Sequence, residues 1–144
     1  MGLALDQARL AEGAREVPVG AVLVDESGRV IASGFNQPVS TSDPTAHAEV
    51  MVLREAARGL SNYRLPGTTM VVTVEPCLMC VGAMIHARIA QVVFGAPEPR
   101  AGALISSCRA HETPGLNHRL QVSGGVLEEE CRRLMQEFFG GKRR

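Results

Sequence analysis

Thr45-Ala46-His47-Ala48-Glu49 and Glu75-Pro76-Cys77-Leu78-Met79-Cys80 are the two stretches on which the organisation of this 144-residue chain depends. The first supplies an imidazole and a carboxylate, and the second supplies two thiols three residues apart. One histidine and two cysteines are donors that Zn²⁺ prefers in a tetrahedral site. Three protein ligands leave a fourth position for water, as in catalytic zinc sites. The sequence therefore predicts a zinc site made by His47, Cys77 and Cys80.

The two cysteines are spaced as a pair at the beginning of a helix. In a first helical turn, the i,i+3 relation places the sulfurs of Cys77 and Cys80 on one face. Pro76 fits just before that turn, where its missing N–H costs nothing. The partial positive charge of the helix N-terminus favours the thiolate, which is the form that binds metal.

The stretch that contains the histidine also indicates a helix start. Asp43-Pro44 is typical of such a start, with Asp43 as the cap, and this places His47 in the first turn. Glu49 lies about 200° further around an ideal helix, so we do not expect it to point in the direction of His47. As a catalytic carboxylate it needs only to reach the metal-bound water.

This combination of groups predicts hydrolytic deamination. Zinc lowers the pKa of a bound water toward about 7, and a nearby carboxylate such as Glu49 can carry the water's protons to a leaving nitrogen. The pattern His-x-Glu followed by Pro-Cys-x-x-Cys is typical of zinc-dependent nucleobase deaminases. A Cys-x-x-Cys pair alone also suits a redox protein or half of a structural zinc site. A redox role leaves His47 and Glu49 unexplained, and no further Cys or His follows Cys80 at finger-like spacing.

Length and composition indicate a single globular domain, residues 1–144. Hydrophobic residues make up 45% of the chain, and 15 basic residues balance 15 acidic ones, which argues against a protein that coats nucleic acid by charge alone. Of the four cysteines, two are not assigned to metal: Cys131 is expected as a buried free thiol, and Cys108 has no assigned role. No signal peptide or membrane span is recognised, so we expect a cytoplasmic protein.

The rest of the pattern predicts alternating strands and helices. Strand–helix–strand alternation favours a partly parallel sheet, with ligands at the carboxyl ends of its strands. Residues 95–120 are expected to be mostly loop, with one helical turn, and Gly140-Gly141 is expected to end the last helix. The expected helices are 3–14, 45–58 with Gly59 as its cap, 77–87 and 127–139. The expected strands are 20–24 and 30–35, joined as a hairpin by a five-residue loop, then 70–74, 89–94 and 120–123.

At these motifs the chain resembles the bacterial tRNA-specific adenosine deaminases of the cytidine deaminase-like superfamily. The resemblance extends over nearly the whole chain. Besides the two stretches above and the phenylalanines and basic residues at the end, it rests on residues 16–22, 34–36, 43–44, 62–65, 81–86, 93–96 and 114–119. The chain differs from the usual family pattern at Glu98-Pro99-Arg100, where an aspartate usually stands in place of Glu98, and at the bulkier Leu104-Ile105-Ser106.

The resemblance implies an α/β fold, a three-layer α/β/α sandwich around a five-stranded mixed sheet, and a homodimer with one Zn²⁺ per subunit. It implies conversion of the wobble adenosine of a tRNA anticodon to inosine, with Glu49 as the proton shuttle. It further implies that Asn36, the backbone of Ala48 and, with the difference noted above, Glu98 bind the nucleotide.

Three basic residues at the end of the chain are expected to contact RNA phosphates: Lys142, Arg143 and Arg144. Two alternatives remain open at this point. One is a deaminase of a free base or nucleoside, such as guanine or cytosine, on the same scaffold. The other is a zinc or RNA-binding module without turnover.

Overall fold

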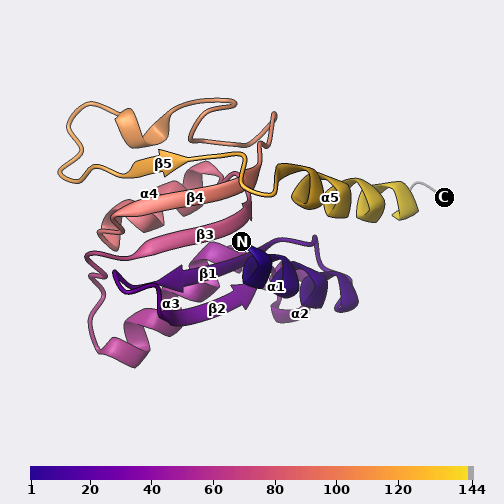
Figure 1. Ribbon diagram of the computed structural model, residues 1–144, viewed down its shortest axis with the longest axis horizontal. Coiled ribbons are helices and arrows are strands. Elements are labelled where there is room, and N and C mark those ends of the chain that lie inside the picture. Colours follow the sequence, from indigo (N-terminus) through magenta and orange to yellow (C-terminus); the bar gives the residue numbers. More distant parts are fainter. Residues whose placement is uncertain (143–144) are drawn as a thin grey trace.

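The computed structural model describes residues 1–142 and places a five-stranded mixed sheet between two layers of helices (Figure 1). The sheet order is β2-β1-β3-β4-β5, which confirms the predicted α/β/α sandwich. The strands are β1 (Gly20–Val24), β2 (Val30–Phe35), β3 (Thr69–Val74), β4 (Gln91–Ala96) and β5 (Gln121–Ser123). The helices are α1 (Gly2–Gly13), α2 (Pro38–Thr41), α3 (Ala48–Leu60), α4 (Leu78–His86), the 3-10 turn η1 (Ala110–Glu112) and α5 (Glu128–Lys142).

The strand directions bring the beginnings of α3 and α4 to one edge of the sheet. β1 is antiparallel to both β2 and β3, so β2 and β3 run in the same direction. β3, β4 and β5 are mutually parallel. Helices α3 and α4 follow β2 and β3, pack against each other, and lie on one face of the sheet, whereas α1 and α5 lie on the other (Figure 1). Each of the two helices therefore begins near the carboxyl end of a strand, where ligands gather in such folds.

The core lies on both faces of β3 and β4. Met70, Val72 and Phe94 are almost completely buried because helices cover both sides of these central strands. This explains why both strands consist of nearly continuous apolar residues instead of alternating ones. Within residues 1–142, none of the helices is both long enough and apolar enough to cross a membrane.

Several predicted element bounds are wrong. Residues 38–41 form α2, where the sequence predicted only loop. α3 begins at Ala48, not near Thr45, and runs past Gly59 to Leu60, after which Ser61 caps it in the left-handed conformation. β4 extends from Gln91 to Ala96 instead of covering 89–94. α5 continues through Gly140-Gly141 to Lys142, whose ammonium lies 4.4 Å from the Phe138 ring centre one turn earlier.

Helix α1 approaches β1 closely through a face of small residues. Ala4 and Ala8 of this helix are fully buried. A Cβ atom added at Gly20 would lie 2.0 Å from the carbonyl oxygen of Ala4 and 2.4 Å from the nitrogen of Ala8. Because both neighbours are backbone atoms, they cannot move aside without shifting the whole helix.

We therefore predict that Gly20→Ala lowers the free energy of unfolding by about 3 kcal/mol, as overpacking of a rigid contact does. Gly59→Ala is the matched control, because a Cβ there meets open space on α3 and should raise stability by up to about 1 kcal/mol. Urea unfolding followed by circular dichroism measures both. Equal midpoints for Gly20→Ala and the unmodified chain would show that α1 does not rest on β1 as described.

Candidate metal centre and active site

His47 is the residue directly before α3, and its backbone is extended, with φ −68° and ψ 152°. Its carbonyl oxygen accepts the N–H of Met51 at 3.0 Å, the first hydrogen bond of the helix. The prediction that His47 lies inside the first turn, with Asp43 as the helix cap, is wrong. Asp43 instead accepts the N–H of Thr45 at 2.8 Å and closes a separate turn before the helix. The extended backbone leaves the imidazole free to turn away from its own helix.

Cys77 holds the corresponding position at the start of α4, also with extended backbone. Its carbonyl oxygen accepts the N–H of Val81 at 3.0 Å, and Cys80 lies in the first turn. The sulfurs of Cys77 and Cys80 therefore come from one helical beginning, as the spacing predicted. The difference is that Cys77 precedes the helix instead of lying inside it.

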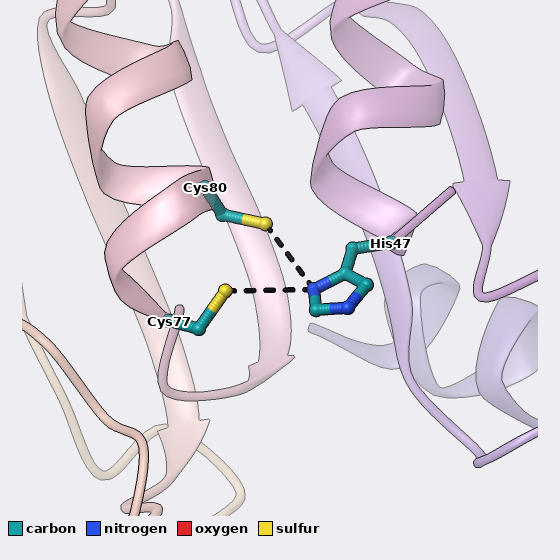
Figure 2. Close-up of side chains that lie close together, drawn as sticks. All are labelled: His47, Cys77 and Cys80. Carbon is teal, nitrogen blue, oxygen red and sulfur yellow. Dashed lines mark hydrogen bonds between the residues drawn. The ribbon is translucent and has the colours of Figure 1, made fainter. Parts of the chain in front are cut away.

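The two sulfurs lie on the same side of the His47 ring (Figure 2). His47 Nδ1 is 3.5 Å from Cys77 Sγ and 3.6 Å from Cys80 Sγ. A tetrahedral zinc ion with ordinary Zn–N and Zn–S bond lengths separates its nitrogen and sulfur ligands by about 3.5 Å. All three donor atoms lie within 4.8 Å of one another. The donor types and their spacing fit zinc without rearrangement.

Hydrogen bonds within this cluster shift the pKa values of the two thiols and the imidazole. A hydrogen bond from Cys80 lowers the pKa of Cys77 to about 4, and the hydrogen bond with His47 acts in the same direction. The same hydrogen bond, together with burial, raises the pKa of Cys80. The hydrogen bond to Cys77 raises the pKa of His47. Since a metal binds thiolate and neutral imidazole, a cation that enters here displaces protons from the site.

Glu49 lies beside the cluster of His47, Cys77 and Cys80 but is not one of its three donors. It lies in the first turn of α3, is 3% exposed, and its Oε2 is 3.4 Å from Cys80 Sγ. Burial raises the pKa of the Glu49 carboxyl group. A carboxyl group with a raised pKa next to an open metal site suits proton transfer near neutral pH.

A cavity of about 220 Å³ opens onto His47, Glu49 and Cys77. Asn36 and Glu98, which the family resemblance implied as nucleotide contacts, both line it. The Glu98 carboxylate accepts the N–H of Ala101, so it is turned onto its own loop. The complete lining is Val17, Val19, Asn36, His47, Glu49, Val74, Glu75, Cys77, Glu98, Ala101 and Met135.

The other residues named from the sequence are not among the lining residues or fall outside the described part of the chain. Ala48 is fully buried between the lining residues His47 and Glu49. Lys142 is exposed at the end of α5, a helix that extends beyond the sheet (Figure 1), while residues 143–144 fall outside the described residues. Cys108 is an exposed free thiol and Cys131 a buried one, as expected for Cys131.

Six lining residues were missed from the sequence: Val17, Val19, Val74, Glu75, Ala101 and Met135. Glu75 is a buried carboxylate directly after an apolar strand, and that unusual position was a usable signal. Met135 comes from α5, more than fifty residues after Cys80, and nothing in the local sequence indicates that it reaches the cavity.

Comparisons with known proteins place this geometry among deaminases. Residues 1–96 match the family model described as the cytidine and deoxycytidylate deaminase zinc-binding region. A tRNA-specific adenosine deaminase of Haemophilus influenzae is 46% identical, over 99% of this chain and 83% of the relative. A solved structure, from studies of A-to-I editing by tRNA:A34 deaminases at the wobble position of transfer RNA, is 44% identical. Its TM-score is 0.90, over 93% of this chain and 96% of the other. A solved guanine deaminase from Nitrosomonas europaea is 26% identical with a TM-score of 0.81, over 96% of this chain and 82% of the other.

The lowered pKa of Cys77 predicts its reactivity in the metal-free protein. The thiolate is the nucleophile, so iodoacetamide should alkylate Cys77 at pH 6, with a rate that falls only as the pH drops toward about 4. Cys131 should stay unlabelled in the folded chain, because it is buried and its pKa is raised to about 11. Mass spectrometry of labelled peptides measures both rates.

Added Zn²⁺ should protect Cys77 from alkylation, whereas Mg²⁺ should not. A Cys77 alkylation rate that rises only above about pH 8, as for an ordinary thiol, would contradict the hydrogen-bonded cluster.

Proposed function

Because the chain belongs to the zinc-binding cytidine and deoxycytidylate deaminase family, we propose the following function for it. It deaminates adenosine to inosine at the wobble position of a tRNA anticodon. The observation that carries the proposal is the cluster of His47, Cys77 and Cys80 with Glu49 beside it; His47, Cys77 and Glu49 line one cavity. This cluster lies in a chain whose relatives are named for that activity.

His47, Cys77 and Cys80 would hold one zinc ion per subunit. When bound, zinc supplies the Lewis acidity that makes water nucleophilic at neutral pH. The spacing of the three donor atoms supports this assignment, and the donors come from the rigid beginnings of two helices instead of from loops.

Glu49 would carry both proton transfers of the reaction. Water adds to C6 of the adenine, and Glu49 takes one of its protons and delivers it to ring nitrogen N1. The carboxylate then passes the second proton to the amino group, the C6–N bond breaks, and ammonia leaves. The raised pKa of this buried carboxyl group supports the role, because the group must both accept and release protons near neutral pH.

The flipped base would enter the cavity between Asn36 and the metal ligands. Asn36 is 8% exposed and offers both an amide donor and an acceptor to the base edge. Its loop is fixed to the metal-site segment, because the N–H of Gln37 donates to the carbonyl of Ala46 at 2.9 Å. The Ala48 backbone and Glu98 are proposed as further contacts. An anticodon loop is already single-stranded, so base extrusion costs only a few kcal/mol.

The basic end of the chain would contact the phosphates of the anticodon stem. Lys142, Arg143 and Arg144 are proposed for this role; they form a local basic group in a chain whose formal net charge is zero. The tRNA substrate and the free thiols of the four cysteines support a cytoplasmic location.

A guanine deaminase is the second candidate, and the structural similarity to such an enzyme supports it. The two activities share the zinc and glutamate chemistry, and they differ in what the cavity must hold. A guanine deaminase has to hold only a free purine, whereas a wobble nucleotide also needs an open path for the RNA backbone.

We predict that Glu49→Gln lowers kcat by about 10²–10⁴-fold, because the amide cannot accept the water's proton. The zinc content should stay at that of the unmodified chain, since Glu49 is not a ligand. Inosine formation in an anticodon stem-loop with adenosine at position 34, followed by mass spectrometry, measures the rate. Cys80→Ala is the contrasting variant, because it should lose both metal and activity.

The same assay separates the candidate functions. Release of ammonia from the stem-loop, and not from free adenosine, guanine or cytidine, is the expected result. Turnover of free guanine without turnover of the stem-loop would contradict the proposed substrate and favour the second candidate.

We also infer a homodimer that covers the beginning of α4. Leu78 and Met79 are 65% and 36% exposed there, directly beside the metal ligands. Leu78→Glu should weaken the dimer at least about tenfold in sedimentation velocity, as loss of a central apolar contact does. Leu10→Glu is the matched control, since Leu10 is 55% exposed on α1, on the other face of the sheet. A monomeric unmodified chain at micromolar concentration would contradict the inference.

A further inference from the structure

Glu75 carries a buried carboxylate at the end of β3, and it is not one of the proposed metal ligands or proton carriers. Its N–H donates to the carbonyl of Ala96 at 2.8 Å, which extends the β3–β4 ladder by one residue. The residue is 3% exposed, so its charge must be balanced inside the protein. That balance comes from a single neighbouring segment, residues 98–106.

Five donors of the 98–106 segment converge on the two carboxylate oxygens. Oε1 accepts the N–H of Glu98 at 3.1 Å and the hydroxyl of Ser106. Oε2 accepts three successive backbone N–H groups, those of Leu104, Ile105 and Ser106, at 3.1, 2.8 and 2.9 Å. Backbone groups that converge on an anion in this way form a nest, and hydrogen bonds to a charged acceptor are stronger than neutral ones.

In the middle of the 98–106 segment, Gly102 has no side chain and so leaves space for the Glu75 carboxylate. A Cβ atom added at Gly102 would lie 2.3 Å from the carboxyl carbon of Glu75. Gly102 also forms an antiparallel bridge with Cys77, and the N–H of Ala103 donates to the carbonyl of Pro76 at 2.8 Å. The segment is therefore tied to Glu75 at both ends and to the backbone of a metal ligand in the middle.

We propose that Glu75 is a positioning residue for substrate. Through its hydrogen bonds it holds the 98–106 segment as a fixed wall of the cavity, which Glu98 and Ala101 of this segment line. The substrate part of this inference rests on the proposed function, whereas the anchoring of the segment does not. Residues 98–106 lack helix or strand along most of their length, so the carboxylate takes the place of a regular hydrogen-bond ladder.

The 98–106 segment is held by the negative charge of the Glu75 side chain more than by its size. All five groups that face it are donors, and a carboxylate offers only acceptors. The amide of a glutamine has nearly the same shape but turns an NH₂ group toward backbone N–H groups. At least one end of the 98–106 segment then loses its partner.

Glu75→Gln tests the anchoring directly by hydrogen exchange of zinc-loaded protein. We expect amide exchange of residues 98–106 to rise at least about tenfold, because several hydrogen bonds to a charged acceptor are lost. Tryptic cleavage after the exposed Arg100 should accelerate in parallel, while cleavage after Arg29 in the hairpin loop stays unchanged as an internal reference. Glu12→Gln, which removes an exposed carboxylate on α1, is the matched control and should change neither rate.

Steady-state kinetics on the anticodon stem-loop tests the consequence. Glu75→Gln should raise KM about tenfold, while kcat changes less than about threefold and the zinc content is unchanged. Gly102→Ala should also raise KM with little change in kcat, because the added Cβ displaces the Glu75 carboxylate although Glu75 itself is unchanged. This second variant keeps the test decisive if Glu75→Gln does not fold.

Unchanged exchange of residues 98–106 in both variants would overturn the anchoring. Loss of zinc or of kcat at unchanged KM would overturn the positioning role, because Glu75 would then act through the metal ligands. A chain that never deaminates the stem-loop contradicts the proposed function and, with it, the substrate role. If the stem-loop is not deaminated, hydrogen exchange of residues 98–106 still tests whether Glu75 anchors this segment.

Discussion

The structure depends on one imidazole and two sulfur atoms that meet at the beginnings of two helices. His47 and Cys77 are thirty residues apart, yet each is the extended residue that precedes a helix, and the strands before these two helices, β2 and β3, run in the same direction. This repeat of strand, extended residue and helix brings the three donor atoms within 4.8 Å of one another. In this position the side chains are free to bind a ligand, because neither of them caps its own helix.

Much of the candidate site was predictable because its chemistry is carried by short motifs. His47, Glu49, Cys77 and Cys80 were identified from residue type and spacing, and the structure brings all four together. Asn36 and Glu98 line the same cavity, although only the family resemblance pointed to them. The contributions of Glu75 and Met135 were not predicted, since a cavity wall is assembled from segments far apart in the sequence.

The mixed sheet was also predictable, whereas the helix ends were not. The signal at Asp43-Pro44 is real, but it forms a closed turn in which Asp43 holds Thr45, and the helix begins only after His47. Two glycines near the C-terminus suggested a helix end, yet α5 passes through them, and the contact of Lys142 with the Phe138 ring supports the extra turn. Local propensity decides such ends only where tertiary contacts are weak.

X-ray absorption at the zinc edge of the metal-loaded protein tests the central claim most directly. The account predicts a four-coordinate ion with two sulfur neighbours at about 2.3 Å, one imidazole nitrogen at about 2.0 Å and one light atom from solvent. Substitution of Cys80 should remove the bound ion. A zinc ion surrounded by four protein ligands, or a folded protein that binds no zinc, would contradict it.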